Sequence, residues 1–512
     1  MKTNFYKNPS KGAVVLGLFF LMTIIATSFQ SCADLDPDPL EFNLPPESFG
    51  SLEEMDKGII GVYRRVTQSA RMTTFYAPAW GGDDMTTHRA LNKADFREFD
   101  QRAVLSSNSR LLTNWNAIYS SLSTINGVLE RSEGLIDNPA VDQTLLLQYR
   151  GEAYFLRGIL FYQLARVHGR IPLTLTQFPP PDISRGTLEE VYSQIEADLL
   201  EAEATLPDIY PNVEAGAPRP NSGSARALLA RLYMDWGGYP IKDASKYALA
   251  ASSAKTVMEN ASSHGFGLMD DVGDLWKVEN RFNQESLFTL VYCTTAEGCP
   301  NNSIANRKFA RLGLPADLGG WNETFAEIKF FQDFPEGHRK DVTYRTDLDW
   351  EGFNAQKSPV FAKVTGPIGD LNAGSFETPR NDFFMRYASI LLIYAEASGL
   401  SGNVTDDSWE ALNMIRRRAA GLPYGTPDPS VDVTSGVIED LAFEERKWEF
   451  AGEYIRWFDL VRREKVKEAL SVRDIPDAPI PEHNPIIGSL ETTNYLAPIP
   501  ADAVAKNPNL AN

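Results

Sequence analysis

The sequence predicts an all-α fold of paired helices that is interrupted by long loop-rich insertions and contains little β structure. Three observations support this. Apolar residues recur every three or four positions in most long segments, which is the periodicity of an amphipathic helix. Several of these segments are rich in alanine and end at a glycine-bearing turn before the next helix, as in helical hairpins. The remaining Pro- and Gly-rich stretches separate the helices, and the longest covers about residues 263–380.

The helices can be placed along the chain from this periodicity. Leu52, Met55 and Ile59 share one face of the first, expected at 51–66. Thr187 and Glu190 have the spacing of a capping box, which starts the helix that runs to residue 207. Others are expected at 111–129, 145–168, 222–236, 243–258, 387–397, 407–420 and 437–461. The pairs at 222–258 and 387–420 are similar to tetratricopeptide hairpins, although their period is irregular.

Composition and length limit the kind of partner and the number of domains. The chain has 512 residues, is 43% hydrophobic and carries a net charge of −19. Its acidity disfavours a nucleic-acid partner, because it repels phosphate and no basic stripe occurs. At ~150 residues per domain the length would allow about three domains. Helices from both halves are needed to form one stack, so residues 51–512 are expected to be a single domain.

The N-terminus has the pattern of an export signal. Lys2, Lys7 and Lys11 precede an uncharged apolar stretch at 13–29, so residues 1–31 are expected to be removed. The following SFQSC resembles the lipobox of bacterial lipoproteins, in which Cys32 would become acylated. Ordinary secretion, with this cysteine near the cleavage site by chance, is the alternative. Residues 32–50 form an acidic, proline-bearing tether that resembles the surface-export signal of Bacteroidetes lipoproteins.

Two further cysteines, Cys293 and Cys299, flank a short segment with the turn residue Gly298. In an oxidising compartment they would form a small disulfide loop, and two buried free thiols are the alternative. Zinc is not expected, because no set of four ligands occurs. Residues 347–352 imitate the start of a calcium loop, but the twelfth position is Ser358 rather than an acid. No metal or cofactor is therefore assigned.

Several motifs follow one another along the chain. They are YRGEAYFLRG continuing to GRIPL at 149–173, ARALLARLY at 225–233, RYA to YAEA at 386–397, LNMIRRRA at 412–419, EERKWEFAGEYIRWFDLVR at 444–462, and LAPIP to NPNL at 496–510. In this order they resemble the SusD/RagB family of nutrient-binding outer-membrane lipoproteins. The resemblance implies a surface lipoprotein that lies over a SusC-like TonB-dependent transporter and captures a ligand, commonly a glycan, without being an enzyme. The charged residues at 444–462 are expected to belong to the scaffold rather than to a site.

Sugar sites combine aromatic faces, which pack on the C–H face of a pyranose, with polar groups that bind hydroxyls. The stretch 76–85 is the first candidate, because its Gly81 and Gly82 argue against burial. In the family, ligand aromatics commonly come from a loop after the first helix and from the long insertion. The candidates for ligand binding are Tyr76, Trp80, Asp83, Asp84, Tyr292, Trp321, Asn322 and Trp350. Packing into the scaffold is the alternative for each aromatic.

Two other classes of function remain open. A secreted glycoside hydrolase would need a catalytic carboxylate pair, which is uninformative in a chain with 68 acids. No G-x-S-x-G, H-E-x-x-H or P-loop string occurs. A helical-repeat scaffold that binds a protein or peptide would leave Trp80 and Trp321 buried. The sequence does not name the glycan.

Overall fold

The computed structural model describes residues 49–71, 74–87, 91–210, 219–294, 306–307, 324–347, 349–350, 353–354, 359–365, 379–473 and 484–511. They belong to one compact unit, Glu47–Asn512. The predicted signal peptide, Cys32 and nearly all of the tether lie outside the described residues. None of the described helices is both long enough and apolar enough to cross a membrane.

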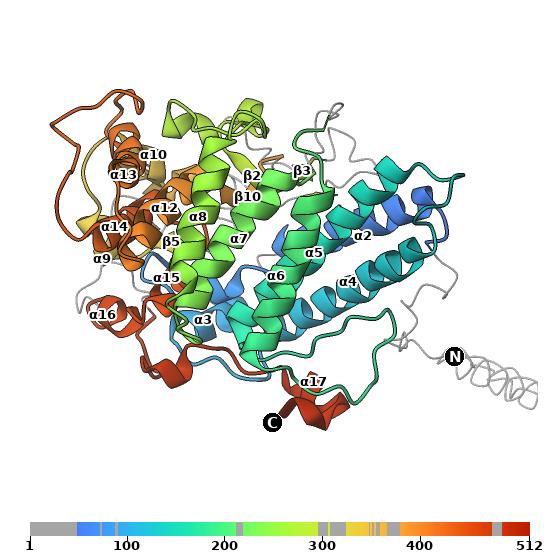
Figure 1. Cartoon of the computed structure of the whole chain (residues 1–512). Coiled ribbons are helices and arrows are strands. Elements are labelled where there is room, and N and C mark those ends of the chain that lie inside the picture. The colour runs from blue at the N-terminus through green and yellow to red at the C-terminus, as the bar shows by residue number, and fades with distance from the viewer. Residues whose placement is uncertain are drawn as a thin grey trace, which may run out of the picture. The chain divides into compact units, whose positions relative to one another are not determined.

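The described part of the chain is mainly helical, which confirms the predicted fold class. The main helices are α2 (Leu52–Arg71), α4 (Ser109–Glu133), α5 (Gln143–His168), α6 (Leu188–Thr205), α7 (Ser222–Gly237), α8 (Lys246–Glu259), α12 (Tyr387–Leu400), α13 (Asp406–Ala419) and α14 (Ile438–Glu449). Each helix from α4 to α8 packs on the next, and α12 packs on both α8 and α14 (Figure 1). Shorter helices are α3 (Ala94–Asp100), α9 (Ile328–Asp333), α10 (His338–Thr343), α11 (Ala362–Thr365), α15 (Arg456–Arg462), α16 (Val466–Leu470) and α17 (Ala501–Lys506).

Local signals account for the ends of these helices. The predicted capping box of α6 is present: the Glu190 N–H donates to Thr187 Oγ1 over 3.2 Å, and the Thr187 N–H donates to Glu190 Oε2 over 2.8 Å. Asn221 caps α7 in the same way. At the other end of α5, Gly169 adopts a φ of 72°, which costs a glycine little, and stops the helix.

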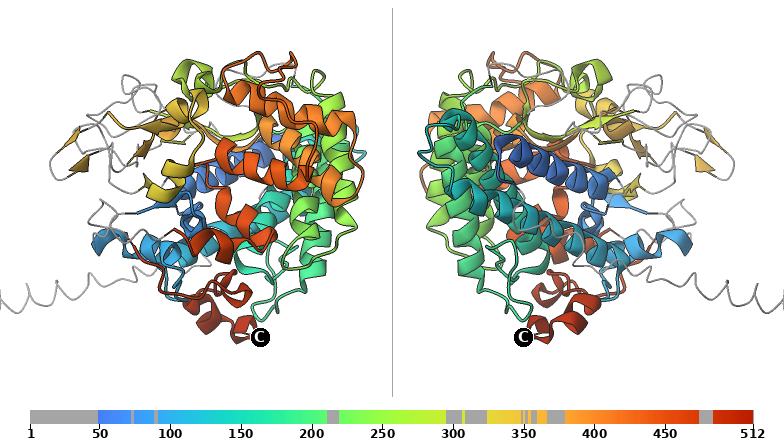
Figure 2. Two further views of the ribbon diagram at one scale, coloured as in Figure 1. Left: turned by 90° about the vertical axis from the view of Figure 1, so that its left-hand side faces the viewer. Right: turned by 90° about the vertical axis from the view of Figure 1, so that its right-hand side faces the viewer.

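The strands are short and form two-stranded sheets. Antiparallel pairs join β1 (Met85–Thr86) to β5 (Phe325–Ala326), β2 (Ser286–Leu290) to β10 (Asp382–Arg386), β6 (Tyr344–Arg345) to β9 (Val360–Phe361), and β7 (Asp349–Trp350) to β8 (Phe353–Asn354); β3 (Tyr292–Cys293) pairs in parallel with β4 (Asn306–Arg307). Figure 2 shows the strands of the insertion gathered on one side of the helical array. Because β2 precedes most of the insertion and β10 leads directly into α12, this pair attaches the insertion to the helices.

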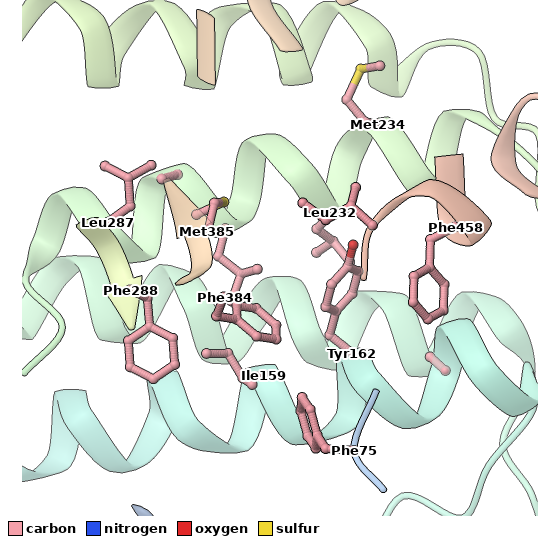
Figure 3. Close-up of a cluster of buried hydrophobic side chains, with 14 of the residues drawn as sticks. Phe75, Ile159, Tyr162, Leu232, Met234, Leu287, Phe288, Phe384, Met385 and Phe458 are labelled. Carbon is pink, nitrogen blue, oxygen red and sulfur yellow. The ribbon is translucent and has the colours of Figure 1, made fainter. Parts of the chain in front are cut away.

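One apolar core joins the two halves of the chain. Phe288 of β2 lies edge to face with Phe155 of α5 at 5.0 Å and with Phe384 of β10 at 5.9 Å between ring centroids. Figure 3 shows Phe288 and Phe384 between the ribbon that carries Ile159 and Tyr162 and the ribbon that carries Leu232. The core therefore includes residues separated by more than 200 positions, and neither half could bury it alone.

The sequence predicts one continuous helix at 437–461, and this prediction is wrong. It is divided into α14 and α15, and the turn between them contains Gly452 at φ 74° and Tyr454 at φ 62°. The Gly452 N–H donates to Asp84 Oδ2 over 3.0 Å, which takes the place of a helical bond. A Cβ on Gly452 would lie 2.5 Å from the ring of Phe361. The break depends on contacts with distant segments, which helical periodicity does not report.

Candidate functional site

The loop after α2 folds into the core, and the expectation that Gly81 and Gly82 keep it from burial is wrong. Trp80 is 0% exposed, and its ring centroid lies 4.5 Å from that of Phe96 and 5.7 Å from that of Tyr454. The glycines permit close packing instead, since a Cβ on Gly81 would lie 2.7 Å from Arg102 Nη1. Trp80 therefore presents no ring face to a sugar in this structure.

Two predicted tyrosines are buried as well. Tyr76 stacks on Tyr454 with centroids 4.4 Å apart and an interplanar angle of 8°. Tyr292 of β3 is 1% exposed, and its backbone N–H donates to Asn381 Oδ1 over 3.0 Å. Burial raises the pKa of both phenols well above the usual value. Both side chains pack in the interior, so their assignment as ligand contacts is corrected to a structural role.

The two predicted acids hold the loop to the turn between α14 and α15. Asp83 accepts from Arg456 Nε over 2.7 Å and from Nη2 over 3.1 Å. Asp84 is 0% exposed, and beyond the bond from Gly452 its Oδ1 finds no hydrogen-bond partner among the described residues. Burial raises the pKa of Asp84 to about 7, and the charge of Asp83 adds to this effect. Neither carboxylate is placed as a free acceptor for sugar hydroxyls.

The remaining predicted residues lie mostly beyond the described part of the chain. Trp321, Asn322 and Cys299 are outside the described residues, and only the backbone of Trp350 is described, in β7. Cys293 is disulfide-bonded. Its pairing with Cys299 stays a prediction.

A buried cluster of ion pairs connects the turn between α14 and α15 to β10 and α11. Arg386 contacts Glu449 Oε1 at 2.6 Å through Nη1, and Glu453 Oε2 at 2.8 Å through Nε. Lys363 reaches Glu453 Oε1 over 2.8 Å. Although burial alone would raise it, the pKa of Glu453 is lowered by these two cations. Glu449 and Glu453 of the motif at 444–462 therefore form ion pairs within the scaffold, as expected from the sequence.

The turn and the roots of the insertion enclose a pocket of about 30 Å³, which is the candidate site. It is lined by Trp276, Lys363, Arg380, Asn381, Asp382, Phe383, Gly452, Glu453 and Tyr454. The rings of Trp276 and Phe383 meet edge to face at 5.7 Å. Aromatic groups beside Asp, Asn and Arg side chains are the combination that binds sugars. The volume is that of about one water, which is too small for a whole sugar ring.

Sequence reasoning missed Trp276 and Tyr454. Tyr454 was assigned to a continuous helix, where an aromatic is expected to pack, and Trp276 stands outside every quoted motif. A weak signal existed, because Tyr454 follows Gly452 closely and Trp276 follows an Asp-rich segment. No feature of the local sequence relates positions 276, 382 and 454, which only the tertiary structure brings together. Among the described residues there is no group of three or more His, Cys, Asp or Glu side chains that could hold a metal ion.

Comparisons with known proteins agree with this architecture. A family model described as starch-binding and associating with the outer membrane matches residues 35–234, and the SusD family model matches residues 344–512. SusD-like protein P2 of Formosa agariphila is 25% identical over an alignment 523 residues long, gaps included. The alignment covers 95% of this chain and 97% of the relative.

Solved structures share the fold. A SusD homolog from Bacteroides thetaiotaomicron has a TM-score of 0.75 at 23% identity, over 91% of this chain and 97% of its own. A laminarin-binding SusD-like protein has a TM-score of 0.68 at 22% identity, over 89% and 97%. The two family models match both ends of the helical array, and the relative spans nearly the whole chain. The chain therefore belongs to the SusD/RagB family.

Proposed function

We propose that this protein is a surface-exposed outer-membrane lipoprotein, anchored through acylated Cys32, that captures a glycan and delivers it to a SusC-like TonB-dependent transporter without cleaving it. The observation that carries the proposal is the meeting of Trp276, Asp382 and Tyr454 at the root of the insertion. The family description and the laminarin-binding relative support a carbohydrate ligand. Family membership supports the transporter and the membrane location.

The pocket suits the edge of a sugar ring rather than a whole ring. Trp276 lines the pocket although its side chain is only 7% exposed, and Lys363 lies over its ring with Nζ 5.5 Å from the centroid. Asp382 and Asn381 are polar neighbours of that ring on β10 and just before it. A glycan resting on this pocket would need further contacts above it. We assign these to the insertion, where Trp321, Asn322 and Trp350 are the candidates.

Binding of oligosaccharides to the mature protein tests the proposal. Isothermal titration against a glycan panel that includes laminarin should identify a ligand. Trp276→Ala and Trp321→Ala should then weaken its affinity at least tenfold. Trp409→Ala on α13 is the matched tryptophan control, because Trp409 does not line the pocket. Unchanged affinity in both Trp276→Ala and Trp321→Ala would refute the site.

The rival functions give different results in the same assay. Release of shorter sugars from the panel would identify a hydrolase and refute non-catalytic capture. Failure of every glycan to bind would favour a scaffold for protein or peptide. Membrane attachment has its own test: Cys32→Ser should move the protein from the outer-membrane fraction to the soluble fraction, and continued membrane association would refute the lipid anchor.

A further inference from the structure

A small pocket lies where the end of α3 meets α15 and the C-terminal segment at 494–498. Its volume is about 20 Å³, which is the space of about one water or one monatomic ion. Arg102, Trp457 and Tyr495 are among the residues that line it, and none of the described acidic residues does. The pocket shares no lining residue with the Trp276 pocket, so the two are separate.

Arg102 lines this pocket and has no carboxylate counter-charge among the described residues. It is 4% exposed, and its Nη2 donates to the backbone carbonyl of Asn494. The guanidinium lies over Trp457, with Cζ 3.8 Å from the ring centroid. Burial and the repulsion of Arg473 lower the pKa of Arg102 to about 9. The fold therefore holds a cation in its interior with only a carbonyl and a ring face as partners.

One nitrogen of this guanidinium is available to a ligand. Nε is closed off and Nη2 is bonded to Asn494. Nη1 makes no hydrogen bond to a described residue, but unlike Nε it is not fully enclosed, so it can be contacted from the pocket. Gly81 leaves room for this nitrogen, since a Cβ there would lie 2.7 Å from Nη1.

Charge and size together favour a small anion in this pocket. A water molecule could accept from Nη1 but would leave the charge of Arg102 unbalanced. Trp457 offsets part of that charge, because the face of an aromatic ring attracts a cation. An anion would restore both the hydrogen bond and the charge balance of the buried group. The volume has no room for a carboxylate or phosphate group, and the mostly apolar wall, which includes Phe99, Val104 and Val167, suits a weakly hydrated ion.

We propose that this pocket binds a single halide ion, of which chloride is the common biological one, against Arg102 Nη1. The bound ion neutralises Arg102 and so stabilises the junction between the end of α3 and the C-terminal segment. Asn494 makes that junction, because its carbonyl accepts from Arg102 Nη2 and its Nδ2 donates to the Arg102 carbonyl over 2.7 Å. The stability of the fold therefore depends on chloride through a specific site. This site does not depend on the proposed glycan site.

Bromide locates the site, because it is close to chloride in size and scatters X-rays anomalously. Crystals of the mature protein soaked in sodium bromide should show an anomalous peak beside Arg102 Nη1. In solution, the midpoint of thermal unfolding should be at least about 2 °C higher in sodium chloride than in sodium gluconate of equal ionic strength, since a ligand that binds only the folded state stabilises it. Arg102→Met should lose both effects. Val104→Leu, which adds a methylene to the pocket wall and keeps the guanidinium, should lose them as well.

Arg131→Met is the control, because Arg131 is an exposed arginine of α4 that does not line the pocket, and it should keep the chloride effect. Two results would overturn the proposal: no bromide peak at Arg102 in the unmodified protein, or a chloride effect in Val104→Leu equal to that of the unmodified protein. The second comparison decides the question even if Arg102→Met fails to fold. Trp276→Ala should keep the bromide peak, so failure of the glycan site and failure of this site are distinguishable.

Discussion

Replacing Asp84 with asparagine should remove a pH dependence of stability that this carboxyl creates. Asp84 is fully buried between the loop after α2 and the turn at Gly452. Burial and the neighbouring Asp83 raise its pKa to about 7, although the Gly452 N–H and Arg456 oppose the shift. Tyr344 also lies near enough for the charge of Asp84 to act on it. In an unfolded chain the same carboxyl titrates near ~3.9.

The sign of the effect follows from the protons bound. Between about pH 4 and pH 7 the folded protein keeps the Asp84 proton, which the unfolded chain has lost. The stabilisation from Asp84 is therefore fully present below about pH 4 and is lost as the pH rises to about 7. At ~1.4 kcal/mol per pH unit, the loss over three units is about 4 kcal/mol. An asparagine amide does not titrate, so Asp84→Asn should lack this loss.

Equilibrium urea unfolding from pH 4.5 to pH 8 measures the difference. The free energy of unfolding of Asp84→Asn, minus that of the unmodified protein, should increase with pH up to about pH 7 and then level off. Asp407→Asn, at an exposed carboxyl, is the control and should show an almost constant difference. A constant difference for Asp84→Asn across this range would refute the reasoning.

Three further substitutions test the packing. Trp80→Ala should lower the free energy of unfolding by about 3–5 kcal/mol because it empties a buried site; loss of glycan affinity without loss of stability would contradict the structural role. Gly452→Ala should cost about 1–3 kcal/mol, measured by denaturant unfolding, because φ is positive and Phe361 is close; a neutral result would argue against the turn. Glu449→Ala should cost about 3–5 kcal/mol by removing one of the two buried carboxylates, Glu449 and Glu285, that Arg386 and Arg418 share, and unchanged thermal unfolding would contradict this.

The helices were predictable because their signals are local. The capping box at Thr187 and Glu190, and the stop at Gly169, involve neighbours along the chain and appear in the structure where the sequence places them. The scaffold role of the charges at 444–462 was predictable too, because such charges on a half-apolar helix need buried partners. The local pattern does not indicate which partners these charges take, such as Arg386 for Glu449.

The candidate site was predicted less well, because burial is a property of the assembled chain. Trp80 beside two glycines has the sequence of an exposed loop, but Phe96 and Tyr454 cover it. Tyr454 in turn lies at a break in a segment with continuous helical periodicity. The reason is the same in both cases: the contact comes from a segment far away in the sequence.

The sequence alone was sufficient to predict the helical fold, most helix boundaries and the family, since these depend on periodicity, capping residues and motif order. The folded chain was needed to show that Asp84 meets Gly452, that Trp276 meets Phe383, and that Arg456 keeps one donor unpaired. Each depends on groups brought together by packing of distant segments. Hydrogen-bond satisfaction and exclusion of water then determine their roles, and neither can be evaluated before the chain has folded.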